Sequence, residues 1–318
     1  MSRELNRREL LALAAGAAAV PARAWARSPG PLRGPLPLER QPVAFFSKQL
    51  QFLDYPALAE TVAEAGFDGI DLTVRPGGHV EPARAEEDLP RAVEAARQAG
   101  LAIPMVTTAI ATAEDGHAAG VLRAAAGAGV GHYRMGYARY DEASGVAATI
   151  EALVPRWREL AALNASLGIR GGYQNHAGRN VGAAVWDLWR LLERVGSPWL
   201  GCQYDVRHAV VEGAHSWVRA LDAIAPFVHT LAVKDFLWSQ GGGSRRDAHV
   251  PLGEGAVDLG EWSRRLRAEG VSAPISLHCE YLEPDEGAPV AARRKAALEA
   301  MRRDLRRLRA VLDAGAKG

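Results

Sequence analysis

The chain has 318 residues, of which 48% are hydrophobic and 24% are charged, so it can form one (β/α)8 domain with a leader or two smaller domains. Lys and Arg number 38 against 37 Asp and Glu, which gives a net charge of +1. No long basic stretch is interleaved with aromatic residues, and this composition argues against nucleic acid as a partner.

Residues 1–26 have the features of an export signal. Arg7 and Arg8 precede an alanine-rich apolar stretch that ends near Val20, and a small-x-small cleavage site follows at residues 24–26. The paired arginines resemble a twin-arginine signal, so we expect export, and a periplasmic location, for the folded protein. The alternative is an ordinary N-terminal helix. The apolar stretch is shorter than the roughly 20 residues that a stable membrane anchor needs. Residues 27–41 are rich in Pro and Gly, which predicts a linker.

Eight short apolar runs alternate with eight helical runs across residues 42–314, leaving a short tail at residues 315–318. The expected strands are residues 43–46, 69–74, 101–106, 132–135, 169–173, 199–204, 228–233 and 274–277. Strands that alternate with helices form a parallel sheet, and eight such units close into a barrel. The sequence therefore predicts an α/β fold, a single-domain (β/α)8 TIM barrel.

One connection is unusually long. Residues 236–255 lie between the seventh strand and its helix, and they include three consecutive glycines at 241–243. A loop of this length in a compact domain is usually functional or mobile. We interpret it as a substrate cover, with a disordered insertion as the alternative.

Polar residues follow nearly every expected strand. They are Ser47-Lys48, residues 71–79, Thr107-Thr108, residues 134–137, 174–176 and 205–208, Lys234-Asp235, and residues 278–281. Because reactive groups of such barrels gather at the C-terminal ends of the strands, these residues are predicted to share one site. The two cysteines, Cys202 and Cys279, are expected to point outward by strand alternation, and no disulfide is predicted.

Two strand ends stand out. Asp205 and His208 are three residues apart, and alternation places His278 and Glu280 on one side of the last strand. A buried carboxylate must be paired, protonated or bound to a metal, so two of them at strand ends favour a functional site.

With these motifs the chain resembles the xylose isomerase-like TIM barrel superfamily, in its branch of sugar phosphate isomerases and epimerases. The resemblance covers about residues 42–314. It rests on Asp205-x-x-His208, on Val-Lys-Asp-Phe at residues 233–236, and on Glu280. Residues 174–176 read Gln-Asn-His where many members have Glu-Asn-His. Residues 71–79 and 250–255 resemble the exported branch.

The resemblance implies a divalent cation, Mn²⁺ or Mg²⁺, held by a Glu from strand five, an Asp from strand six, a His from strand seven and a Glu from strand eight. This chain keeps the Asp and the last Glu, as Asp205 and Glu280. It has Gln174 at the strand-five position and Ala232 at the strand-seven position. Oxygen ligands suit such cations, so Asp205, Glu280 and Gln174 are the candidate metal ligands, with a weaker site expected and metal binding left open.

The resemblance further implies a carbohydrate ligand and proton abstraction beside a carbonyl. We expect Glu280 as the base, His208 as a proton shuttle or hydroxyl-binding residue, and Lys234 and Lys48 as charge stabilisers. An amide cannot accept a proton, so epimerisation would need a second base in place of Gln174, namely His208, Lys48 or Lys234. Candidate substrate-binding residues are Arg75, His79, Arg134, Tyr137, Asn175, His176, His278 and Trp238.

Two alternatives to a sugar isomerase or epimerase stay open. One is a lyase or hydrolase acting on 3-keto-glycosides, and the other is a non-catalytic periplasmic sugar-binding protein. The sequence specifies neither the sugar and its stereocentre nor the oligomeric state.

Overall fold

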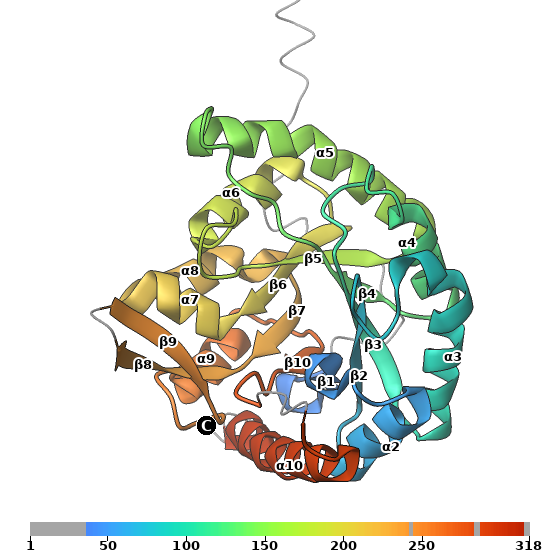
Figure 1. Cartoon of the computed structure of the whole chain (residues 1–318). Helices are drawn as coiled ribbons and strands as arrows, with labels where there is room; N and C mark the ends of the chain where they lie inside the picture. The colour runs from blue at the N-terminus through green and yellow to red at the C-terminus, as the bar shows by residue number, and fades with distance from the viewer. Residues whose placement is uncertain (1–35, 242–243, 283–286, 315–318) are drawn as a thin grey trace, which may run out of the picture.

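The structure is a computed structural model that describes residues 36–241, 244–282 and 287–314. The expected signal at residues 1–26, most of the linker and the tail at 315–318 lie outside the described residues. Eight parallel strands form a closed barrel in the order β1-β10-β7-β6-β5-β4-β3-β2, which confirms the predicted TIM barrel (Figure 1). The barrel strands are β1 (Val43–Phe46), β2 (Gly69–Val74), β3 (Ala102–Thr108), β4 (His132–Arg134), β5 (Arg170–Gln174), β6 (Leu200–Asp205), β7 (Val228–Val233) and β10 (Ile275–Leu277).

Helices surround the strands on the outside of the barrel (Figure 1). They are α2 (Tyr55–Ala65), α3 (Ala85–Gln98), α4 (Ala118–Gly127), α5 (Gly145–Leu167), α6 (Val185–Val195), α7 (Val206–Gly213), α8 (Trp217–Ile224), α9 (Leu259–Ala268) and α10 (Val290–Ala314). Short 3-10 segments are η2 (Leu38–Arg40), η3 (Ser47–Leu50), η4 (Pro82–Arg84), η5 (Ala214–Ser216) and η6 (Ala225–Phe227).

Local sequence explains the ends of these helices. At α2 the side chain of Asp54 accepts a hydrogen bond from the N–H of Ala57, which satisfies a free donor of the first turn. Gly66 then ends the helix with φ of +92°, a left-handed conformation that glycine adopts without steric cost. The strands pack under the helices through fully buried residues, such as Trp157 of α5 against Tyr173 of β5. Burying a large apolar side chain contributes about 1.5–3 kcal/mol.

Two elements differ from the sequence prediction. Helix α7 begins directly after β6, because the side chain of Asp205 accepts a hydrogen bond from the N–H of His208 and caps the helix. The long connection is not a loop throughout, since β8 (Asp235–Gly241) and β9 (Ser244–Val250) pair as an antiparallel ribbon. Its paired strands exclude the disordered-insertion alternative for the described residues. Figure 1 shows this ribbon projecting from the barrel beside α7.

Asp235 fixes the base of the ribbon. Its buried carboxylate accepts hydrogen bonds from the backbone N–H groups of Phe236, Gly253, Gly255 and Val257. A Cβ on Gly255 would collide with this carboxylate, so the close approach requires glycine. Strand alternation predicts that Asp235 points outward if Lys234 points into the barrel. In the structure Asp235 anchors the segment that follows β9.

We expect Asp235→Ala to lower the free energy of unfolding by about 3 kcal/mol, because several buried N–H groups lose their acceptor. Urea denaturation followed by tryptophan fluorescence measures this change. Asp313→Ala, at an exposed position near the end of α10, is the control and should leave stability unchanged. Equal stability of the two variants would contradict the anchoring role.

Cys202 and Cys279 are both free and buried, in line with the expectation of no disulfide. The thiol of Cys279 faces outward to Asp304 of α10, with 3.5 Å between sulfur and oxygen. Within the described residues, no helix has the length and apolar character needed to cross a membrane.

Candidate active site at the C-terminal ends of the strands

Lys234, Asp205 and Glu280 form the centre of the site. The Nζ atom of Lys234 lies 3.4 Å from Oδ2 of Asp205 and 3.2 Å from Oε2 of Glu280. The side chains of Lys234 and Asp205 are 2% and 0% exposed, whereas that of Glu280 is 16% exposed. The ends of β6, β7 and β10 thus bring together residues that are far apart in the sequence, and solvent reaches the cluster at Glu280.

Electrostatic attraction determines the charge states of Lys234 and Glu280. Burial works to lower the pKa of Lys234, but the charges of Asp205 and Glu280 outweigh it and raise that pKa above its ordinary value. Burial likewise works to raise the pKa of Glu280, but the charge of Lys234 and the contact with His278 hold it well below its ordinary value. Lys234 is therefore a permanent cation rather than a base, and Glu280 is an ionised carboxylate.

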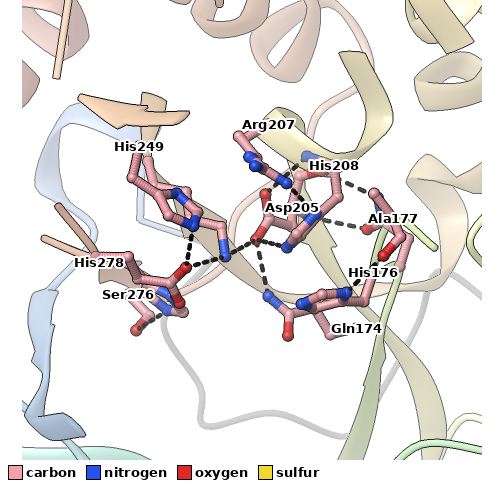
Figure 2. A network of polar contacts seen from close by, with 12 residues as sticks. Gln174, His176, Ala177, Asp205, Arg207, His208, His249, Ser276 and His278 are labelled. Carbon is pink, nitrogen blue, oxygen red and sulfur yellow. Dashed lines mark hydrogen bonds and ion pairs between the residues drawn. The ribbon is translucent and has the colours of Figure 1, made fainter. Parts of the chain in front are cut away.

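Neighbouring strands hold Asp205 in place. The side chain of Asn175 donates to the backbone carbonyl of Asp205 and accepts from its N–H. The Nε2 group of Gln174 donates to Oδ2 of Asp205 at 2.8 Å (Figure 2). Asn175 is fully buried and both ends of its amide are engaged, so it positions β6, and its expected contact with a substrate stays a prediction.

His208 is a neutral donor. Nδ1 of its ring lies 2.9 Å from NH1 of Arg207, and arginine can only donate, so Nδ1 is the acceptor and Nε2 carries the proton (Figure 2). Burial and the charge of Lys234 hold the pKa of His208 well below its ordinary value. Its Nε2 lies 3.7 Å from Oδ2 of Asp205 and makes no hydrogen bond to any described residue. Of the two roles expected for His208, this tautomer favours donation to a substrate hydroxyl over proton shuttling.

Two histidines flank Glu280. Nδ1 of His278 lies 3.5 Å from Oε1 of Glu280, and Nε2 of His249 lies 3.3 Å from Oε2. The other nitrogen of His278 contacts the hydroxyl of Ser276, which donates to Asp71. The ring of His278 also stacks on Phe46, which holds the ring in place. The fixed ring in turn orients the carboxylate of Glu280.

His249 was not predicted as a site residue, because it lies in a segment without apolar periodicity. The antiparallel ribbon brings it back to the strand ends, where pairing opposite Phe236 places it beside Glu280. Its one sequence signal is its place directly before residues 250–255, the motif of the exported branch. Arg207 was also missed: it is buried and pairs with Asp247 of β9, and so ties the ribbon to α7.

The expected metal ligands do not fit a divalent cation. The ammonium of Lys234 lies between the carboxylates of Asp205 and Glu280, within ion-pair distance of both. The carbonyl oxygen of Gln174 accepts from Arg134 at 3.1 Å and Tyr137 at 2.5 Å, so its amide group presents N–H rather than oxygen to Asp205. Among the described residues, no three His, Cys, Asp or Glu side chains are arranged to hold a metal ion.

The other expected substrate contacts separate into two groups. His176 and Tyr137 are partly exposed beside the centre: the ring of His176 packs at 3.9 Å from that of His208 and at 5.1 Å from that of Tyr137. Arg134 contacts Gln174, and Arg75 lies over the ring of Phe46. These residues surround the cluster of Lys234, Asp205 and Glu280.

His79, Lys48 and Trp238 do not join that group. Both ring nitrogens of His79 are engaged, by the hydroxyl of Thr73 and the carbonyl of Leu50, so it braces the loop after β2. Lys48 is exposed in η3 and makes no ion pair within the described part of the chain. Trp238 is 40% exposed on β8, where its ring lies edge-on to Phe236.

Solved structures share this fold at low identity. The structure of L-ribulose 3-epimerase matches with a TM-score of 0.66 and 13% identity, covering 87% of this chain and 96% of the other. A xylose isomerase-like protein from Mycobacterium smegmatis, in complex with magnesium, has a TM-score of 0.63 and 15% identity, covering 87% and 99%. The probable 3-DHS dehydratase from Bacillus anthracis has a TM-score of 0.60 and 16% identity, covering 80% and 98%.

No curated protein matches this chain in sequence. The family model described as xylose isomerase-like TIM barrel matches residues 59–311, most of the described chain. With the closed eight-stranded barrel, this match shows that the chain belongs to the xylose isomerase-like TIM barrel family.

Proposed function

We propose that this chain is an enzyme that isomerises a sugar or keto-sugar by removing a proton from a carbon beside a carbonyl. The observation that carries the proposal is the ionised, partly exposed Glu280 held against the buried ammonium of Lys234. A carboxylate in this state accepts a proton, and a cation beside it stabilises the negative charge that forms on the carbonyl oxygen. The epimerases among similar structures support a carbohydrate substrate.

The residues suit a reaction with one base. Glu280 takes the proton from the carbon, and the electron pair moves to the carbonyl oxygen to form an enediolate. Lys234 and the Nε2–H of His208 are the donors available to that oxygen or to a neighbouring hydroxyl. Glu280 then returns the proton to the former carbonyl carbon, while the proton of the neighbouring hydroxyl moves to the former carbonyl oxygen. A new carbonyl results at the carbon that lost its proton, which completes an isomerisation. Epimerisation at one carbon needs a proton from the opposite face, and the amide of Gln174 cannot supply it.

The test is exchange of solvent deuterium into aldoses, ketoses and keto-sugars, followed by NMR. We expect one C–H position of the correct sugar to exchange, with the isomer appearing at a comparable rate. Exchange in none of these sugars would contradict the proposal. Ligand binding that survives Glu280→Gln, with no exchange, would instead support the non-catalytic sugar-binding alternative.

Elimination is the second candidate, because the same single base serves it. After Glu280 removes the proton, a group on the next carbon leaves in place of the second proton transfer. The probable dehydratase among the similar structures supports this chemistry on the fold. Incubation with a 3-keto-glycoside distinguishes the two: release of the aglycone selects a lyase, whereas its absence together with deuterium exchange selects the isomerase.

Activity is expected to survive metal removal. Lys234 lies where the two carboxylates would otherwise share a cation, so the site already contains its positive charge. Dialysis against EDTA should change the exchange rate by less than about twofold, a difference of under about 0.4 kcal/mol in the barrier. Metal analysis of the same sample is the control. Loss of exchange that Mn²⁺ or Mg²⁺ restores would show that a divalent cation is required.

We also propose that the protein is exported through the twin-arginine pathway, on the evidence of Arg7-Arg8 and the apolar stretch that follows. Cell fractionation should find the wild-type chain in the periplasm and the Arg7→Lys, Arg8→Lys double variant in the cytoplasm. Equal distribution of both would contradict the proposal. Export disfavours phosphorylated sugars as substrates, because these are mainly intracellular.

A further inference from the structure

Arg134 is a buried cation that no carboxylate of the described chain neutralises. Its side chain lies at the end of β4, and the residue is 7% exposed. NH1 donates to the hydroxyl of Tyr137 and the amide oxygen of Gln174, which are both neutral groups, and Nε is buried with no partner among the residues that the structure describes. Within the described residues no carboxylate lies at ion-pair distance from Arg134. An uncompensated buried charge is costly, so this guanidinium favours an anion that the described chain does not supply.

Arg75 also makes no ion pair with any described residue. It follows β2, is half-buried, and lies 5.8 Å from the centre of the Phe46 ring. Strand register brings the two arginines to the same stretch of the rim, because Thr73 of β2 pairs with Thr107 of β3, which pairs with Arg134 of β4. Burial and the charge of Arg134 lower the pKa of Arg75, against the opposing effects of Tyr137, Asp71 and Glu280. The buried cations Arg207 and Lys234 differ from Arg134, since Arg207 pairs with Asp247 and Lys234 is shared by two carboxylates.

The barrel order places Arg134 across from the proposed base and Arg75 nearer to it. Strand β4, which ends at Arg134, stands opposite β10, which precedes Glu280, whereas β2, which precedes Arg75, is two strands from β10 in the closed ring. Phe46 contacts both Arg75 and His278, and His278 faces Glu280. Arg134 reaches Asp205 through Gln174. A small ligand with an anionic group near the arginines can therefore place another of its carbons beside Glu280.

The loop after β2 favours a carboxylate over a phosphate. Phosphate sites use free backbone N–H groups in glycine-rich turns. Here the N–H of Gly77 donates to Glu81, that of Gly78 to the carbonyl of Arg75, and that of His79 to the hydroxyl of Thr73. These donors are already used, and Glu81 adds a negative charge beside them. Two planar guanidinium groups without such N–H groups suit a planar carboxylate.

We propose that Arg75 and Arg134 bind a carboxylate of the substrate, so that the substrate is a sugar acid such as a keto-uronate. The inference rests on the proposed function for the carbohydrate and the reacting carbon. It assigns to the two arginines the recognition of charge, and to Glu280 and Lys234 the chemistry.

Matched ligands test the proposal. Calorimetry with the full chain compares D-fructuronate with D-fructose, and D-glucuronate with D-glucose, which differ only in a carboxylate in place of a hydroxymethyl group. We expect the acid of at least one pair to bind ten- to a hundredfold more tightly, on the order expected for charge-assisted pairing. Equal affinities within both pairs, or no acid binding at millimolar concentration, would overturn it. Tighter binding of D-fructose 6-phosphate than of D-fructuronate would overturn it in favour of a phosphate.

Variants assign the effect to the arginines. Arg75→Ala should remove most of the preference for the acid over the matched neutral sugar. Arg134→Lys keeps the charge and guards against misfolding, and it should reduce the preference partially because a lysine cannot form two parallel hydrogen bonds. The matched control is Arg139→Ala, an exposed arginine after the same strand, which should keep the full preference. A preference that persists in Arg75→Ala and Arg134→Lys contradicts the assignment.

The two proposals fail separately. Deuterium exchange into a neutral sugar, with no preference for acids, sustains the isomerase and overturns the carboxylate site. Tight binding of a sugar acid that depends on Arg75, without exchange in any sugar, sustains the carboxylate site and removes the isomerase.

Discussion

Replacing Glu280 by Gln is expected to reduce deuterium exchange by about 10²- to 10⁴-fold, the contribution typical of a general base. The amide has nearly the shape of the carboxylate and can still contact His278 and Lys234, so the fold should persist. Exchange measured by NMR, with circular dichroism as a check on folding, quantifies the loss. Glu254→Gln, an exposed position after β9, is the control and should exchange at the wild-type rate.

The pH dependence of the wild type provides a second readout for Glu280. Lys234 and His278 hold the pKa of Glu280 well below its ordinary value against the effect of burial. The base therefore stays ionised as the pH falls to the ordinary range of glutamate, and activity is lost only as the pH passes through the lowered pKa. Exchange that declines already near pH 6 would identify a different group as the base. A Glu280→Gln variant that exchanges at the wild-type rate would also identify a different group as the base.

Replacing Lys234 by Met should have three linked effects. The rate is expected to fall about 10²- to 10³-fold, because the enediolate loses its buried cation. The acid limb of the pH profile should move to higher pH, because the charge that lowers the pKa of Glu280 is gone while burial, which raises it, remains. The free energy of unfolding should fall by about 3–5 kcal/mol, since Asp205 and Glu280 lose their shared partner.

A merely structural lysine would lower stability without moving the acid limb, so the pH profile separates the two roles. The double variant Lys234→Met, Glu280→Gln should be less destabilised than the sum of the single changes, because no unpaired carboxylate remains at position 280. Lys48→Met is the control from the exposed η3 segment and should resemble the wild type. If Lys48→Met reduced exchange as strongly, Lys48 would regain the role that the sequence predicted for it.

Much of the barrel could be predicted from local pattern. The expected strands at residues 43–46, 69–74 and 228–233 have the same bounds in the structure. Buried parallel strands form continuous apolar runs between glycine-capped helices, and both signals are local. The ribbon of β8 and β9 was missed because a projecting two-stranded element packs little against the core and so needs no apolar periodicity.

The candidate site was likewise predictable from the sequence only in part. The sequence by itself determined which residues stand at strand ends, because the alternation of strands and helices places Asp205, Lys234 and Glu280 on one rim. Charge states, tautomers and partners depend on contacts between residues that are distant in the chain. Only the tertiary structure decided that Lys234 lies between two carboxylates, that His249 joins Glu280 and that both nitrogens of His79 are used. It also decided that Nε of Arg134 is buried with no hydrogen-bond partner among the described residues. Each of these is a matter of distance and burial across the barrel, which no local pattern encodes.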